Sequence, residues 1–114
     1  MTDIENYLGV LSLCGISFIL AGLAMLFFPP KKINSLYGYR TTNSMKNQKN
    51  WDFAQKYSTK FMLLLSIVFL LIATVNSILS VPEPLRMISE FIILLSGIGL
   101  MFWKVEKEIK KQQP

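Results

Sequence analysis

Residues 61–81 read FMLLLSIVFLLIATVNSILSV, and no charged side chain interrupts them. At about 1.5 Å per residue, a helix of this length crosses the roughly 30 Å hydrocarbon core of a bilayer. The apolar residues form a block and do not alternate with polar ones at the period of a strand or of a surface helix. The stretch therefore predicts a membrane-spanning helix.

The residues that follow predict a helical hairpin. Pro82 and Pro84 are separated by a single residue and force a turn. A second apolar block, residues 85–103, then predicts an antiparallel span that is joined to the first by a short connection.

Two polar side chains lie inside this predicted hairpin. Glu90 follows Arg86 by four residues, a spacing at which the two can pair on one helix face near the interface. Asn76 lies near the end of residues 61–81. An ionisable group inside a span is a functional candidate, but pairing and hydrogen bonding between helices fit the sequence as well. Asn76 and Glu90 therefore form a candidate intramembrane polar site.

A further uncharged block at the N-terminal side, residues 7–28, predicts another span. It ends in two phenylalanines, two prolines and two lysines, an aromatic and basic boundary typical of a membrane interface. A cleaved signal peptide would need a basic start, whereas Asp3 and Glu5 precede this block without any Lys or Arg. The sequence predicts an all-α integral membrane protein, a single domain over residues 1–114, with three transmembrane helices at about 7–28, 61–81 and 85–103.

The basic residues predict the orientation in the membrane. The segment between the first and second spans holds seven Lys and Arg, the tail after residue 103 holds four, the hairpin turn holds only Arg86, and the N-terminus holds none. Short segments rich in these residues stay in the cytoplasm. We therefore predict a bacterial cell-membrane protein with its N-terminus outside, and with the long loop and the C-terminus in the cytoplasm.

Composition argues against several functions. Hydrophobic residues make up 52% of the chain and charged residues 17%. The net charge is +5, and the basic residues lie between and after the apolar blocks, a distribution that suits a bilayer surface better than a nucleic acid. Histidine is absent, Cys14 lies within a span, and Asp52 is the only carboxylate of the long loop. With no acid–base pair and no ligand cluster, we predict neither an enzyme, nor a cofactor, nor a metal.

The second half of the long loop predicts an amphipathic helix at the cytoplasmic interface, at about residues 44–60, that runs into the second span. Ser44 is a candidate N-cap. An apolar face opposes a face of lysines, which would point towards lipid phosphates or water. The apolar face comprises Trp51, Ala54, Tyr57 and Phe61, and the basic face comprises Lys49, Lys56 and Lys60.

The same loop carries a spaced set of residues that resembles the signature of the SdpI family, named for the immunity protein of the sporulation-delaying-protein toxin system of Gram-positive bacteria. This sequence departs from the family pattern in two ways. The founding immunity protein is a longer chain with more spans, and family members often carry Asn where Gln55 stands here. The matching residues are Asn34, Tyr37, Gly38, Tyr39, Arg40, Thr41, Ser44, Met45, Trp51 and Ala54.

The resemblance implies that the chain binds a membrane-active peptide toxin in the bilayer, confers immunity to it or senses it, and recruits a cytoplasmic regulator through the loop. Except for Ala54, the signature residues are the candidate ligand or partner site. Arg40 offers a planar fork for a carboxylate or phosphate, and the aromatic rings favour the interface. The same groups could instead anchor the loop, with Arg40 bonded to helix-end carbonyls.

A different class of function also fits the sequence. Asn76 and Glu90 could line a pathway in a small transporter or channel, which would require a homo-oligomer because three helices alone enclose little space. Flux that disappears in Glu90→Gln would distinguish this reading from toxin immunity.

Overall fold

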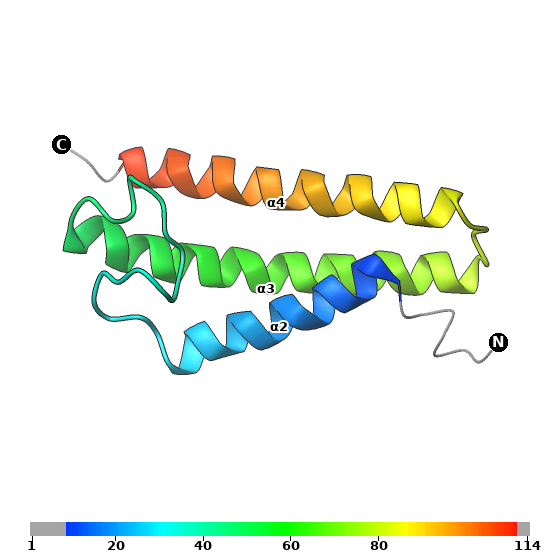
Figure 1. Ribbon diagram of the computed structural model, residues 1–114, viewed down its shortest axis with the longest axis horizontal. Coiled ribbons are helices and arrows are strands. Elements are labelled where there is room, and N and C mark those ends of the chain that lie inside the picture. The colour runs from blue at the N-terminus through cyan, green and yellow to red at the C-terminus, as the bar shows by residue number, and fades with distance from the viewer. Residues whose placement is uncertain (1–8, 112–114) are drawn as a thin grey trace.

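The computed structural model describes residues 9–111, which contain three α-helices and no strand. Helix α2 covers Val10–Phe27, α3 covers Gln48–Ile78 and α4 covers Leu85–Lys111 (Figure 1). All three are long and apolar enough to cross a membrane. The prediction of an all-α protein with three spans is thereby confirmed, while the predicted start of the first span at residue 7 lies outside the described residues.

The helices form an elongated bundle of 53 × 25 × 19 Å. We call the end with residues 28–47 the loop end, and the end with residues 79–84 the turn end. Helix α2 starts at the turn end and α4 finishes at the loop end (Figure 1). At about 1.5 Å per residue, the 18 residues of α2 match a hydrocarbon core, whereas the 31 of α3 and the 27 of α4 exceed it. The polar parts of α3 and α4 therefore extend past the membrane at the loop end.

The structure does not show the interfacial helix predicted at about residues 44–60 as an element of the loop. Residues 48–60 are the first part of α3, which continues without a break to Ile78. Asn47, not Ser44, is the N-cap, and its side chain accepts a hydrogen bond from the Asn50 N–H at 2.8 Å. Because residues 44–80 contain neither Pro nor Gly, nothing interrupts the helix where the apolar block begins.

The apolar face of this polar part of α3 is covered by protein. Trp51 and Ala54 are fully buried, and Ala54 shares a core cluster with Tyr39 of the loop and Val105 of α4. The last helix also runs further than the predicted residue 103, and Ile109 in its last turns is fully buried. The amphipathic pattern thus reflects packing against the loop and α4.

Helix α2 packs mainly against α3 through small residues. A Cβ added at Gly22 would lie 2.5 Å from Cδ2 of Leu63, and one added at Gly15 would lie 2.9 Å from Cγ of Leu70. A side chain at either position would force Leu63 or Leu70 to move, and small residues are expected where helices approach closely in a membrane. Helix α4 packs on the opposite side of α3, where Phe69 is buried beneath Gly97.

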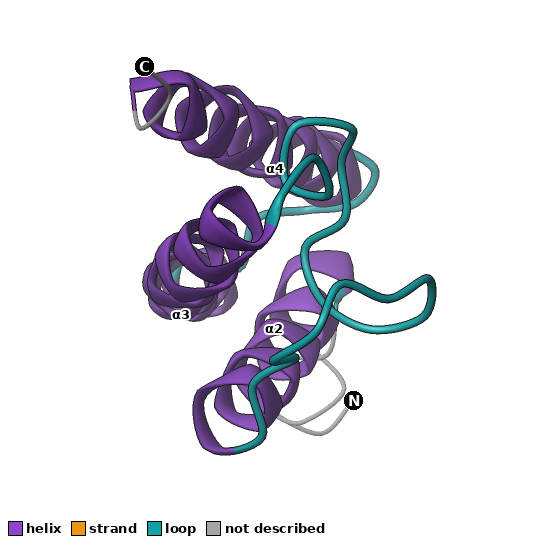
Figure 2. Cartoon of the chain, turned by 90° about the vertical axis from the view of Figure 1, so that its left-hand side faces the viewer, coloured by secondary structure: helices purple, strands orange, loops and turns teal. Residues whose placement is uncertain are grey.

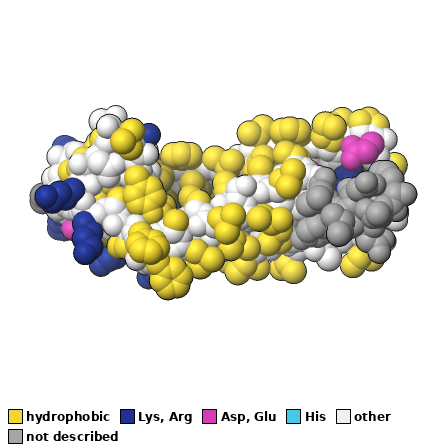
Figure 3. All heavy atoms as spheres, turned by 60° about the horizontal axis from the view of Figure 1, so that its bottom comes forward, with side chains coloured by type: hydrophobic (Ala, Val, Ile, Leu, Met, Phe, Trp, Pro, Cys, Tyr) yellow, Lys and Arg dark blue, Asp and Glu magenta, His cyan; other side chains and the backbone are white. Residues whose placement is uncertain are grey.

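The surface has the polarity of a membrane protein. Large apolar side chains form a belt around the middle of the bundle, and Lys and Arg gather at the loop end (Figure 3). Leu20, Leu71 and Leu95 are each more than 60% exposed, which only a lipid environment would make favourable at this density. The chain is therefore a membrane protein whose core is small and whose outer face contacts lipid.

Candidate functional site

The long loop crosses the loop end of the bundle, from α2 to the side of α4 and back to the start of α3 (Figure 2). It carries most of the residues predicted as a ligand or partner site. Its attachment to each helix determines what those residues can reach.

Two aromatic side chains fasten the start of the loop. The Tyr37 hydroxyl donates to the carbonyl of Phe28 at the end of α2, at 2.9 Å. Trp51 Nε1 of α3 donates to the carbonyl of Pro30 at 2.6 Å. Because Trp51 is fully buried, it serves as an anchor and has no face left for a ligand.

A side-chain amide clamps the middle of the loop to α3. Gln55 accepts the Tyr39 N–H at its Oε1, at 2.7 Å, and donates from its Nε2 to the Tyr39 carbonyl, at 2.8 Å. Gly38 precedes this point with φ 108°, and a Cβ there would lie 2.6 Å from Gln55 Oε1 and 2.8 Å from Pro30 Cγ. The backbone can pass through this position only as glycine.

A carboxylate holds the far side of the loop to α4. Glu106 accepts hydrogen bonds from the Tyr39 hydroxyl at 2.8 Å, from Thr41 Oγ1 at 2.9 Å and from Asn43 Nδ2 at 2.9 Å. Burial, and then the hydrogen bond to Glu106, raise the pKa of the Tyr39 phenol above its usual range. Tyr39 therefore stays protonated and donating at any physiological pH.

Local turns shape the rest of the loop. Asn34 Oδ1 accepts from the N–H groups of Leu36 and Tyr37, at 2.9 and 2.7 Å. Thr41 and Ser44 exchange backbone-to-hydroxyl bonds of 2.8 and 3.1 Å. Thr41 and the fully buried Ser44 therefore fix the conformation of the loop.

Arg40 differs from these anchors. Its Nη1 donates to the Ser35 carbonyl at 2.5 Å, and its side chain is exposed. No other partner is recorded for its remaining N–H groups within residues 9–111. The predicted bond from Arg40 to helix-end carbonyls is not formed, since Ser35 lies within the loop and Tyr37 makes that kind of contact instead.

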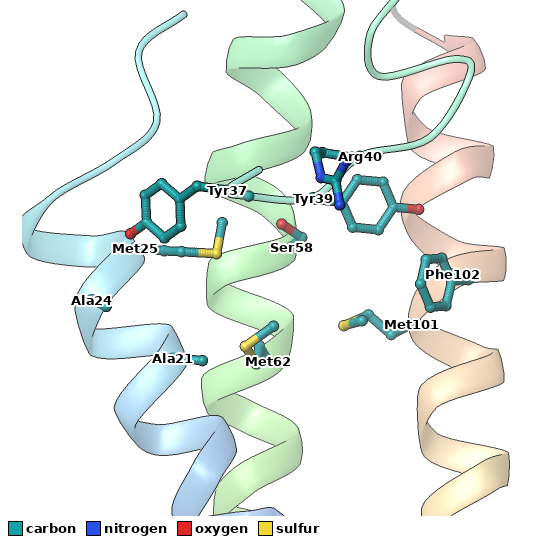
Figure 4. A pocket seen from close by; sticks show the side chains of 11 residues that line it. Ala21, Ala24, Met25, Tyr37, Tyr39, Arg40, Ser58, Met62, Met101 and Phe102 are labelled. Atoms are coloured by element: carbon teal, nitrogen blue, oxygen red, sulfur yellow. The ribbon is translucent and has the colours of Figure 1, made fainter. Parts of the chain in front are cut away.

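Beneath the loop lies a crevice of about 400 Å³. Helix α2 forms one wall and α4 the other, with α3 at the back and the loop as the roof (Figure 4). The lining residues are Ala21, Ala24 and Met25 of α2, Ser58 and Met62 of α3, Met101 and Phe102 of α4, and Tyr37, Gly38, Tyr39 and Arg40 of the loop. Ala21 and Phe102 are exposed, so the crevice opens sideways, where lipid would surround the bundle.

The structure thus divides the predicted site residues into two groups. Four consecutive residues, Tyr37 to Arg40, reach the crevice. Asn34 and Ser44 bind the loop to itself, Trp51 binds it to α3, and Thr41 binds it to itself and to Glu106 of α4. The partly buried Met45 does not line the crevice.

Sequence reasoning missed Gln55 and Glu106, which hold the roof. Gln55 could have been found, because it follows Ala54 on the face of α3 that was predicted to be apolar. Glu106 gave no such signal, because its partners lie more than 60 residues away in the chain.

The second predicted site, at Asn76 and Glu90, lies at the turn end. Glu90 is 1% exposed and accepts from Asn76 Nδ2 at 3.1 Å, from Arg86 Nε at 3.4 Å and from the Leu11 N–H at 3.3 Å. One carboxylate thereby links α2, α3 and α4. The predicted pairing of Arg86 with Glu90 is present, and Asn76 joins it as an interhelical bond.

The geometry of the roof and crevice is suited to binding. The described residues contain no group of three or more His, Cys, Asp or Glu that could hold a metal ion. The crevice combines apolar walls with one guanidinium at its mouth, an arrangement for an amphipathic ligand.

Comparison with known proteins places the chain in a family. Residues 31–104, which include the loop, α3 and most of α4, match the SdpI/YfhL protein family. Over 92 residues the chain is 38% identical to "Uncharacterized protein YfhL" of Bacillus subtilis (strain 168), covering 81% of this chain and 78% of that protein. No solved structure matches it. The chain belongs to the SdpI/YfhL family.

Proposed function

We propose that this chain is a non-enzymatic binding protein that captures a membrane-active peptide within the bilayer, and so confers immunity to that peptide or reports its presence. Membership of the SdpI/YfhL family supports the proposal. The observation that carries it is the seam between α2 and α4, which is apolar, open to lipid, and roofed by the family's signature residues.

The seam suits a peptide that is already helical in lipid. Such a peptide has its backbone groups satisfied and needs only a closely packed surface. Helix α2 offers the small side chains of Ala21 and Ala24 on the wall of the crevice, and α4 faces them across it (Figure 4). A peptide helix laid against the open side of this seam, and not inside the crevice, would contact two helices at once, without a group of the core having to be exposed.

The loop end would face the cytoplasm in this proposal, because the loop, residues 48–60 of α3 and the part of the chain after residue 103 hold eleven of the chain's twelve Lys and Arg. A soluble regulator would meet the loop there. The roof is bonded both to α3 and to α4, so a peptide that separates the helices would also strain the contacts of Tyr39 with Gln55 and Glu106.

A transporter is less well supported. Its pathway would need polar groups free to meet a solute, whereas Asn76 and Glu90 are bonded to each other and to neighbouring helices. This arrangement favours a role in holding the bundle together.

A survival assay tests the proposed function. The chain is expressed in a toxin-sensitive bacterium and exposed to a panel of membrane-active peptide toxins. We expect the inhibitory concentration of at least one peptide to rise, and Ala24→Trp to remove the gain by filling the seam.

Gly99→Trp is the matched control, because a side chain at Gly99 enters open space on α4. It should keep the gain at equal membrane levels of protein. Unchanged sensitivity to every peptide, with the native chain present in the membrane, would refute the proposal.

A further inference from the structure

The crevice has a polarity gradient along its depth. Its roof lies at the level where α2 ends and where Lys104 begins the charged part of α4. Arg40 lies in that roof, and Ala21, Met62 and Met101 line the walls below (Figure 4). In a bilayer the roof is therefore at headgroup level and the walls are at acyl-chain level.

Arg40 is the cation at this mouth without a carboxylate partner among the described residues. The carboxylates that the structure describes at the loop end are all engaged elsewhere. Asp52 accepts from Gln48 at 2.7 Å, and Glu106 accepts the three bonds of the loop. Glu108 pairs with Lys104 at 3.1 Å and Lys111 at 3.4 Å, and the hydrogen bond from Lys104 holds the pKa of its carboxyl below the usual value. Within residues 9–111, therefore, no carboxylate is left to pair with Arg40, and its fork can accept an anion from another molecule.

Size decides between a peptide and an acyl chain as the occupant of the crevice itself. One turn of α-helix, about 10 Å wide and 5.4 Å long, fills roughly 420 Å³. The crevice holds about 400 Å³, so a peptide helix would fit no more than a turn unless α2 and α4 moved apart. A single acyl chain is thin and flexible, and methionine side chains adapt to such a ligand.

We propose that the crevice binds an anionic phospholipid of the leaflet at the loop end. The phosphate accepts from the free N–H groups of Arg40, and one acyl chain enters between α2 and α4 beneath Tyr37 and Tyr39. This binding goes beyond the proposed function, because it needs no peptide. A peptide that docks in the seam would displace the lipid.

The test uses the full chain, purified in a mild detergent, and native mass spectrometry. The probes are dioctanoyl phosphatidylglycerol, which is anionic, and dioctanoyl phosphatidylcholine, which carries no net charge. We expect one phosphatidylglycerol per chain, and a loss of its affinity of about tenfold in Arg40→Gln, the size expected when one charge-assisted hydrogen bond is removed.

Lys46→Gln is the matched control, since Lys46 is exposed at the same end and does not line the crevice. It should change the affinity less than twofold, roughly the effect expected of a surface charge. Ala21→Trp should lower the affinity for phosphatidylglycerol by filling the space between the walls, although Arg40 is intact. The Tm of each variant is measured to confirm that it is folded.

Equal affinity for the two lipids would overturn the recognition of an anionic headgroup. Equal losses in Arg40→Gln and Lys46→Gln would overturn the proposal in favour of nonspecific attraction to a basic surface. Inorganic phosphate that binds with the same affinity as dioctanoyl phosphatidylglycerol would overturn the acyl-chain contact. Since no peptide is present, failure here is distinct from failure of the survival assay.

Discussion

At the scale of single residues, two side chains fix the loop by different chemistry. Gln55 both donates to and accepts from the Tyr39 backbone, so it holds one point in one orientation. Glu106 only accepts, and it gathers three donors from residues 39–43. Bonds to an ionised acceptor are the stronger kind, so Glu106 carries more of the loop's attachment.

Replacing Glu106 with alanine should lower the stability of the loop, because three donors lose their common acceptor. We expect a cost of about 1.5–3 kcal/mol, the usual value for hydrogen bonds to a charged group. Thermal unfolding in detergent measures it. Glu108→Ala on the same helix should leave the Tm almost unchanged, because Glu108 pairs only with lysines at the surface. Equal Tm values for the two variants would contradict the role given to Glu106.

The sequence could predict only part of this residue-level picture. Tyr37 to Arg40 were selected by resemblance and do line the crevice. The separation of anchors from binding groups could not be predicted, because Trp51 and Arg40 are both typical of a membrane interface, and only the structure shows that Trp51 is buried and Arg40 exposed. Glu106 stands in a lysine-rich tail whose composition suggests solvent.

At the scale of elements, the close contact of α2 with α3 holds one wall of the crevice against its back. Gly22 allows Leu63 of α3 to approach α2 closely below the roof. Hydropathy predicted the three spans well because lipid demands an apolar block. Hydropathy could not predict where α3 begins, because the start of the apolar block at residue 61 marks the membrane boundary and not the start of the helix.

A larger side chain at Gly22 should push α2 away from α3. We expect Gly22→Leu to destabilise the protein by about 1–3 kcal/mol, the usual cost of overpacking. Gly99→Leu is the control, because no atom lies within 4 Å of a Cβ added there. Unfolding in detergent should show a lower Tm for Gly22→Leu alone. Equal effects of the two substitutions would mean that the contact between α2 and α3 adjusts freely.

At the scale of the whole molecule, the two described ends of the chain lie at opposite ends of the bundle (Figure 1). An odd number of spans requires this arrangement, but it does not say which end is outside. The gathering of Lys and Arg at the loop end predicts that this end is cytoplasmic.

Cysteine labelling tests the orientation. In a Cys14→Ala background, Ser35→Cys should be shielded from an impermeant thiol reagent in intact cells, and Glu83→Cys should be labelled. Both side chains are exposed, so accessibility to the reagent depends on the side of the membrane. The background protein should remain unlabelled. The reverse pattern would place the loop outside the cell and exclude a cytoplasmic regulator that binds it.

The three helices are joined unequally, and this affects how the bundle responds to its bilayer. Helices α2 and α4 are bonded at the turn end through Glu90, but at the loop end only the roof connects them. Two helices that are bonded directly at one end and joined only through a loop at the other change their spacing at the loop end when the bilayer becomes thinner, because α2 just spans the hydrocarbon and then tilts. We therefore expect the fatty-acid composition of the host membrane to tune what the crevice admits, without any change in the protein sequence.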